Sequence, residues 1–177
     1  MMAGSWRILM IYPRFISNSF WNYTEACKLV GARYPAAPLG LITVAALLPQ
    51  TWDIRLVNRN TEELTDADLD LAALVMIGGM LNQQPDFLYL IELAHLHGKP
   101  VCVGGPDVSS SPHLYAAADF QVIGEAEHVM KDLVAAWERG EWSGVFTAEK
   151  FKTDVTQSPL PRYDLLKLDH YLYIGVQ

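Results

Sequence analysis

The chain has 177 residues, of which 51% are hydrophobic, and its 20 acidic and 13 basic side chains give a formal net charge of −7. This length and composition are typical of one globular domain with a full apolar core. The negative charge and the scattered arginines exclude a surface built to bind nucleic acid. No apolar run reaches the roughly 18 residues that a membrane-spanning helix needs.

The chain has two cysteines, Cys27 and Cys102, too few for a disulfide framework. Two thiolates also cannot by themselves hold an iron–sulfur cluster or a structural zinc ion. Cys102 lies in an apolar run, where a buried free thiol is expected. The first residues lack the pattern of a signal peptide. We therefore expect a protein of the reducing cytoplasm.

The first predicted strand is the apolar run Arg7–Tyr12, which ends at Pro13. A long aromatic connection, Arg14–Pro38, follows, with a short helix expected at Thr24–Val30. Such a loop is usually a binding loop or lid. Two alternatives stay open for its aromatic residues: a small cluster packed over the sheet, or a contact with another domain. Prolines at both ends predict a helix over Pro38–Leu48.

The rest of the chain alternates strands with helices. The alternating pattern of Trp52–Asn58 predicts a strand at the edge of the sheet. Three continuous apolar runs predict strands buried on both faces: Ala73–Ile77, Val101–Val103 and Asp119–Ile123. Helices are expected at 62–70, 86–97, 113–118 and 125–140, with a polar loop at 107–112. Beyond Gly144 only a hairpin-like stretch, Val145–Thr147, is visible.

Five strands alternating with helices predict an α/β fold with a parallel, doubly wound sheet and helices on both faces. The natural strand order for this Rossmann-like or flavodoxin-like class is 2-1-3-4-5. The third and fourth strands end in Gly78-Gly79 and Gly104-Gly105. Tight turns also use glycine pairs, but two pairs on one carboxyl edge favour a ligand site, because ligands bind there in open α/β sheets.

Several common ligands of this fold are excluded by the loops. The first strand is followed by Pro13-Arg14-Phe15 and not by G-x-G-x-x-G, so a dinucleotide site is excluded. No P-loop sequence is present. The loop also lacks the glycines of a flavodoxin phosphate site. A response-regulator receiver is excluded because its acidic residues are missing from the ends of the first and third strands.

Five segments carry a resemblance to a known family, through their order and spacing: Pro38–Leu41 with Leu47–Pro49, Gly78–Leu81, Val103–Pro106, Asp119–Glu127 and Pro159–Asp164. Together they resemble the N-terminal cobalamin (B12)-binding domain of the B12-binding radical SAM proteins. The resemblance covers nearly the whole chain.

Cobalamin-binding α/β domains typically carry D-x-H-x-x-G after the first strand, S-x-L after the third and G-G after the fourth. Gly104-Gly105 matches the last motif, and Gly79-Met80-Leu81 matches S-x-L with glycine for serine. No histidine precedes His95, so D-x-H-x-x-G is absent. The resemblance therefore implies base-off cobalamin with no protein histidine on the cobalt. It implies cofactor contacts, with no catalytic and no metal-ligating residue, at Pro13, Phe15, Leu39, Gly78, Gly79, Met80, Leu81, Gly104, Gly105, Pro106, Val122, Gly124 and Glu125.

The resemblance also implies a larger parent enzyme. Residues 1–144 would be the cobalamin-binding domain, and 145–177 a linker to a radical SAM barrel with a [4Fe–4S] cluster and S-adenosylmethionine. The cluster motif C-x-x-x-C-x-x-C is missing from this chain, so the chain is expected to bind and not to catalyse within a methyltransferase-type enzyme. One alternative is a domain that has lost cobalamin and serves as a docking scaffold for the barrel. A stand-alone enzyme has no nucleophile–base pair to support it.

Overall fold

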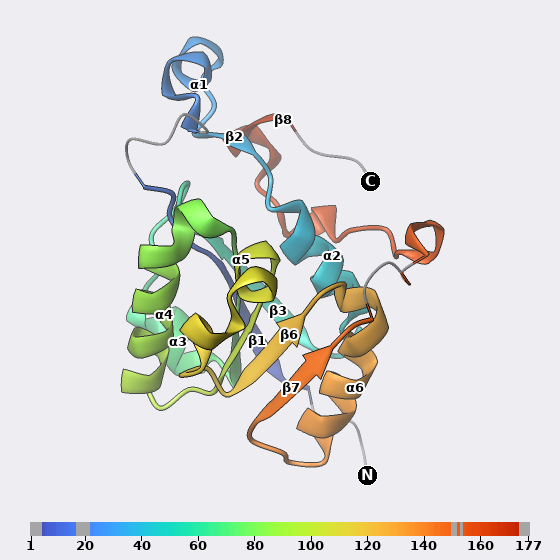
Figure 1. Cartoon of the computed structure of the whole chain (residues 1–177). Coiled ribbons are helices and arrows are strands. Elements are labelled where there is room, and N and C mark those ends of the chain that lie inside the picture. Colours follow the sequence, from blue (N-terminus) through green and yellow to red (C-terminus); the bar gives the residue numbers. More distant parts are fainter. Residues whose placement is uncertain (1–4, 17–21, 150–151, 153, 174–177) are drawn as a thin grey trace.

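A computed structural model describes residues 5–16, 22–149, 152 and 154–173 (Figure 1). Six parallel strands form the main sheet in the order β3-β1-β4-β5-β6-β7. Their bounds are β1 Arg7–Tyr12, β3 Asp53–Asn58, β4 Leu74–Gly78, β5 Val101–Gly104, β6 Phe120–Ile123 and β7 Gly144–Thr147. The α/β, doubly wound, Rossmann-like prediction is confirmed, and the five predicted strands lie in the predicted order.

The predicted number of strands in the main sheet is wrong by one. Val145–Thr147 is not hairpin-like, because β7 runs parallel to β6 and places Phe146 beside Val122. Side chains along β7 alternate between half-buried and exposed, as expected of an edge strand with one covered face. Four residues are too short a run for that alternation to stand out in the sequence. The predicted domain boundary at residue 144 falls on the first residue of this strand.

Helices cover both faces of the sheet (Figure 1). Alternate residues of β1 point to opposite faces: Ile8 and Met10 enter one apolar cluster, and Leu9 and Ile11 enter the other. The first cluster packs under α2 (Leu39–Leu47) and α6 (Ala126–Glu138). The second packs under α3 (Asp66–Leu71), α4 (Gln84–Leu96) and α5 (Pro106–Ser110).

The segment 106–118 differs from its prediction. The expected polar loop at 107–112 is wrong, because Pro106–Ser110 forms α5. Proline at the first helical position favours this start. Asp107 is buried and accepts hydrogen bonds from Tyr115 and from Gln84, the latter at 2.9 Å. A helix expected at 113–118 is replaced by a 3₁₀ turn over Pro112–Tyr115.

A second, two-stranded sheet lies over the carboxyl ends of the main strands (Figure 1). It pairs β2 (Tyr34–Ala36) with β8 (Tyr171–Tyr173), in parallel, and stands beside the expected short helix α1 (Thr24–Val30). The sequence did not predict either strand. Residues 17–21 of the long aromatic connection, and 174–177, lie outside the described part of the chain.

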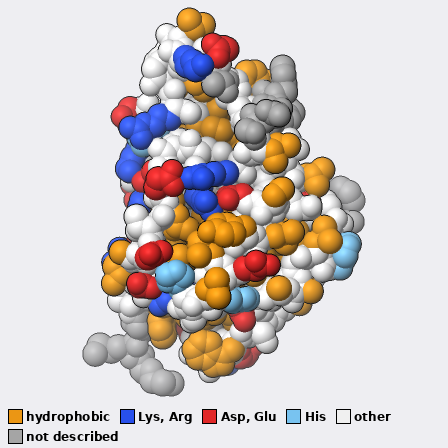
Figure 2. All heavy atoms as spheres, turned by 90° about the vertical axis from the view of Figure 1, so that its left-hand side faces the viewer, with side chains coloured by type: hydrophobic (Ala, Val, Ile, Leu, Met, Phe, Trp, Pro, Cys, Tyr) orange, Lys and Arg blue, Asp and Glu red, His pale blue; other side chains and the backbone are white. Residues whose placement is uncertain are grey.

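The described surface carries mixed charge. Figure 2 shows acidic and basic side chains close together on the face it displays, among scattered hydrophobic ones. Within the residues that the structure covers, no helix is long and apolar enough to cross a membrane.

Candidate functional site

Two neighbouring strands carry no side chain where they end at the carboxyl edge. The register pairs Gly78 of β4 with Gly104 of β5, and a Cβ built on Gly104 would lie 3.4 Å from the Cβ of Val122 on β6. All three positions therefore face the same side of the sheet, the side covered by α2 and α6. We call Gly78, Gly104 and Val122 the glycine row.

The glycine row is covered by the start of α2. A Cβ on Gly78 would lie 2.9 Å from Cδ2 and 3.3 Å from Cγ of Leu41. Leu41 is itself buried, so it packs against the floor that the missing side chain leaves open. Leu39, another predicted site residue, begins the same helix and packs at the edge of the same cluster.

The other two predicted glycines have a different surrounding. Gly105 has a φ of 103°, and a Cβ there would lie 2.8 Å from the carbonyl oxygen of Gly79. A Cβ on Gly79 would meet Oε1 of Gln83 at 3.1 Å and Cδ1 of Phe87 at 3.2 Å. These glycines let the loops after β4 and β5 approach each other closely. Their predicted role in holding a cofactor stays a prediction.

A buried glutamine ties the ends of β1 and β4 together. Gln83, fully buried, donates from Nε2 to the carbonyl of Pro13 at 2.6 Å and accepts at Oε1 from the backbone N–H of Met80 at 3.0 Å. Met80 and Leu81 stay 40% and 66% exposed beside it. The structure therefore brings the predicted residues Pro13, Met80 and Leu81 to one corner of the edge.

An aromatic cluster stands over the end of β1. The ring of Phe15 lies 6.0 Å from that of Tyr12 and 5.6 Å from that of Tyr34. Burial raises the pKa of Tyr12 to about 12, and burial also raises the pKa of Tyr34. Both phenols therefore stay protonated at neutral pH. Phe15 thus packs with Tyr12 and Tyr34 in a cluster over the sheet, which we call the aromatic cap. This arrangement agrees with the first of the two alternatives for the aromatic residues of the long connection.

The remaining predicted residues border the edge at β6. Gly124 donates its backbone N–H to Oγ of Ser109, at 2.9 Å, which joins the end of β6 to α5. Glu125 is the exposed N-cap of α6, and Pro106 is the exposed first residue of α5. These residues therefore lie near one another at this part of the edge.

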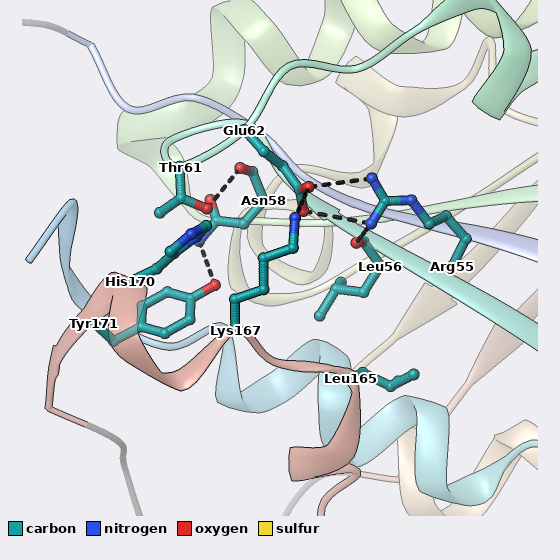
Figure 3. A pocket seen from close by; sticks show the side chains of 9 residues that line it. All are labelled: Arg55, Leu56, Asn58, Thr61, Glu62, Leu165, Lys167, His170 and Tyr171. Atoms are coloured by element: carbon teal, nitrogen blue, oxygen red, sulfur yellow. Dashed lines mark hydrogen bonds and ion pairs between the residues drawn. The ribbon is translucent and has the colours of Figure 1, made fainter.

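A small polar cavity lies where the C-terminal segment meets β3, and the sequence did not predict it (Figure 3). Its volume of about 20 Å³ is that of a single water site. Glu62 accepts from Lys167 at 2.6 Å and from Arg55 at 3.1 Å. Asn58 donates to the Tyr171 hydroxyl at 3.1 Å. This network anchors the C-terminal segment and leaves its charges paired.

A second, open groove has a volume of about 300 Å³ and lies between α2, α6 and the segment after β7. It is lined by Leu47, Glu127, His128, Lys131, Lys152, Asp154 and Gln157. Neither this groove nor the polar cavity is lined by the glycine row. Among the described residues, no group of three or more His, Cys, Asp or Glu could hold a metal ion.

The fold and this edge define a doubly wound α/β protein whose carboxyl edge has a side-chain-free floor. No family model matches the chain. It is similar to an uncharacterized methyltransferase of Synechocystis, with 46% identity over 173 residues, which are 97% of this chain and 32% of that protein. It is also 33% identical, over 178 residues, to the hopanoid C-2 methylase of Rhodopseudomonas palustris, covering 97% of this chain and 33% of the methylase.

A third relative is an uncharacterized methyltransferase of Pyrococcus horikoshii, 28% identical over 175 residues, 84% of this chain and 38% of that protein. The chain thus spans about a third of the length of the relatives it matches. All three relatives carry methyltransferase or methylase in their names, and the first two match this chain over nearly the whole of its length.

Proposed function

We propose that this chain is the cobalamin-binding module of a methyltransferase-type radical SAM enzyme. The observation that carries the proposal is the glycine row at the carboxyl edge of a doubly wound sheet, the edge where such sheets bind ligands. Similarity along 97% of the chain to a methyltransferase and to a hopanoid C-2 methylase supports it.

The residues fit the nucleotide tail of cobalamin in one specific respect. With Leu41 moved aside, Gly78 and Gly104 would leave a floor on which a flat base can lie, bordered by Val122. Pro13 and Phe15, at the end of β1, would face the corrin ring, and Gly79, Gly105, Pro106, Gly124 and Glu125 would border the entrance. Bound cobalamin would supply a cobalt atom able to carry a methyl group.

The loop after β1 offers no imidazole for the cobalt. Its described part, Pro13–Ile16, contains no histidine, which supports base-off binding with no protein histidine as a ligand. Two of the described histidines are paired with carboxylates. His95 contacts Asp119 at 2.9 Å, and His97 contacts Asp70 at 2.8 Å.

The rest of the proposed enzyme would lie outside this chain. A radical SAM barrel, with a [4Fe–4S] cluster and S-adenosylmethionine, would follow the segment 145–177, of which Val145–Thr147 belongs to the sheet. The relatives' threefold greater length leaves room for such a domain. The substrate would be selected there and not by the residues described here.

Titration with hydroxocobalamin, followed by gel filtration and visible spectroscopy, tests the proposal. We expect cobalamin to co-elute with the chain. Gly104→Val should abolish this, because the new side chain stands on the floor; its Cβ would meet Val122 at 3.4 Å, and circular dichroism of the variant checks that it folds. Gly40→Val is the matched control, since a Cβ there meets nothing within 4 Å. Equal binding by wild type and Gly104→Val would contradict the proposed floor.

A second candidate function is a docking scaffold that no longer binds cobalamin. The packing of Leu41 over Gly78 favours it, because that contact closes the floor without any ligand. In that case neither this chain nor a longer chain that includes the following domain would retain cobalamin on gel filtration. Retention by either one would rule the scaffold out.

A further inference from the structure

Apart from Thr43, helix α2 has no polar side chain on any side, which is unusual for a helix packed on one face of a sheet. Its sequence is LGLITVAAL, and Leu41, Ile42, Thr43 and Ala45 are buried. The C-terminal segment covers its outer side: Arg162 donates its backbone N–H to the carbonyl of Ile42 at 3.0 Å. Tyr163, Leu165 and Leu166 pack against the same cluster. The helix therefore lies between two layers, held by apolar contacts on both sides and by this one backbone hydrogen bond at Ile42.

The apolar contacts have no directional preference, so they allow the start of the helix to shift about the hydrogen bond at Ile42. The ends of α2 are not fixed by side chains either. Its N-cap, Pro38, makes no side-chain capping hydrogen bond, and no acidic residue lies in its first turn or basic residue in its last. By contrast, α3 has a capping box between Thr65 and Asp68.

Leu41 is the residue of α2 that packs against Gly78 in the glycine row. Its Cδ2 would stand 2.9 Å from a Cβ on Gly78, closer than real side-chain contacts allow. Gly78 is thus what admits Leu41 to the sheet. A flat ligand lying across Gly78 and Gly104 would need the same volume, since two groups cannot share it.

We propose that Leu41 is a movable plug, which fills the floor over Gly78 when no ligand is bound and leaves it when the nucleotide tail of cobalamin enters. This rests on the proposed function. Displacing a buried leucine costs free energy, so the apparent affinity equals the intrinsic affinity multiplied by the fraction of molecules in which the plug is open. Leu41 is then a residue that determines affinity for the tail and not for the corrin ring.

The test compares hydroxocobalamin with dicyanocobinamide, which has the ring but lacks the nucleotide tail. Leu41→Ala should bind cobalamin more tightly, by about threefold to tenfold, because it removes the cost of opening. Its affinity for the cobinamide should stay that of the wild type. Leu41→Phe should weaken cobalamin binding by a similar factor, because the larger ring fills the floor more completely.

Leu47→Ala is the matched control, with the same truncation on the same helix but in the wall of the open groove. It should leave both affinities unchanged. The proposal is overturned if Leu41→Ala leaves cobalamin affinity unchanged or weaker, if it shifts the cobinamide equally, or if Leu47→Ala has the same effect. Wild-type protein that binds neither corrinoid would instead contradict the proposed function, and the plug with it.

A measurement on the wild-type chain avoids any question of misfolded variants. In the ligand-free protein, a nuclear Overhauser contact is expected between the Leu41 δ-methyl groups and the Gly78 α-protons, because these groups touch. Saturation with hydroxocobalamin should abolish this contact while the methyl signals of Leu47 keep their positions. Persistence of the Leu41–Gly78 contact in the saturated protein would overturn the plug.

Discussion

At the scale of single residues, the two glycines of the pair after β5 are alike in sequence and unlike in their surroundings. Gly105 combines a φ of 103° with a backbone oxygen 2.8 Å from where its Cβ would stand, whereas Gly104 has neither feature. Side chains at such a φ are strained, by roughly 1–3 kcal/mol. Gly105 is therefore required by the fold itself, and Gly104 leaves room for a binding role.

Alanine substitutions at Gly104 and Gly105 distinguish the glycine that the fold requires from the one that it does not. We expect Gly105→Ala to lower the free energy of unfolding by at least about 1–3 kcal/mol, because the strain and the close oxygen act together. Gly104→Ala should leave it unchanged to within about 1 kcal/mol, because the chain entropy that alanine saves in a strand offsets its close contact with Val122. Urea denaturation followed by circular dichroism measures both. Equal losses would show that the backbone at Gly105 relaxes.

The two thiols should be inert in the folded protein. Burial raises the pKa of Cys102 to about 12, and burial raises the pKa of Cys27 as well. Both side chains are buried, and the thiolate is the form that reacts. A colorimetric thiol reagent should therefore modify neither cysteine at pH 8 until urea unfolds the chain, after which it should modify both. Rapid reaction of one thiol in native buffer would contradict this burial.

At the scale of elements, one arginine joins β3 to α3 and to the loop between them. Arg55 contacts Glu62 and Asp68, each at 3.1 Å. Burial by itself raises the pKa of both carboxyls, but hydrogen bonds from Lys167 and Arg55 to Glu62, and from Thr65 and Arg55 to Asp68, outweigh it. Both pKa values are therefore lowered from their ordinary 4.5 and 3.8.

Lowered carboxyl pKa values make folding stability depend on acid in a defined direction. The stabilisation is complete above the ordinary pKa values and is lost as the pH falls through the lowered native ones. We expect the unfolding free energy to decline below about pH 4.5. Arg55→Met should reduce the stability at neutral pH and flatten that decline.

The matched control for Arg55→Met is Arg139→Met, since Arg139 pairs with Glu141 at an exposed site and exposed pairs contribute little. Urea denaturation between pH 3 and pH 7 checks both variants. An acid decline that is as steep in Arg55→Met as in the wild type would show that other carboxyls carry it.

At the scale of the whole molecule, the C-terminal segment acts as part of the core. It covers α2 through Leu165 and Leu166, pairs β8 with β2, and places Lys167 on Glu62 (Figure 3). Removing it exposes the outer side of a largely apolar helix. The segment after β7 is thus linked to the stability of the glycine row, although it lies far from it in sequence.

Truncation after Pro159 tests this link. We expect backbone amides of α2 to exchange hydrogen much faster in the truncated chain, because local opening becomes easier when packing is lost. Amides of α4, on the opposite face, should keep their protection. Leu160→Ala, at a side chain that is 82% exposed, is the control and should change neither helix. Unchanged exchange in α2 would show that the segment is not needed to hold it.

Sequence patterns were sufficient to predict most of the main sheet, but they did not predict the pairing of β2 with β8 over its carboxyl edge. Continuous apolar runs such as Ala73–Ile77 and helix signals such as Pro85 have local causes, so they predicted five strands of the main sheet, their order and the main helices. The pairing of Tyr34 with Tyr171 depends on two three-residue strands far apart in the chain. No local pattern predicts such a contact.

The sequence located the glycines of the candidate site at the carboxyl edge, but not what surrounds each of them. Glycines at the ends of two neighbouring parallel strands indicate the edge. Which glycine faces α2 and which faces Phe87 depends on the side to which each position points, and the φ of Gly105 depends on the approach of Gly79. Leu41 was predicted only as part of a helix face, because nothing in its neighbours in sequence indicates Gly78.

The pairing of β2 with β8 decides where anything fused to this molecule would stand. Strand β1 begins at the amino end of the main sheet, whereas β8 lies above the carboxyl edge, toward the opposite end of the molecule in Figure 1. A purification tag or surface anchor placed before residue 5 is therefore separated from the glycine row by the length of the strands. One placed soon after residue 173 begins beside the aromatic cap, so corrinoid titrations should use the amino-terminal tag.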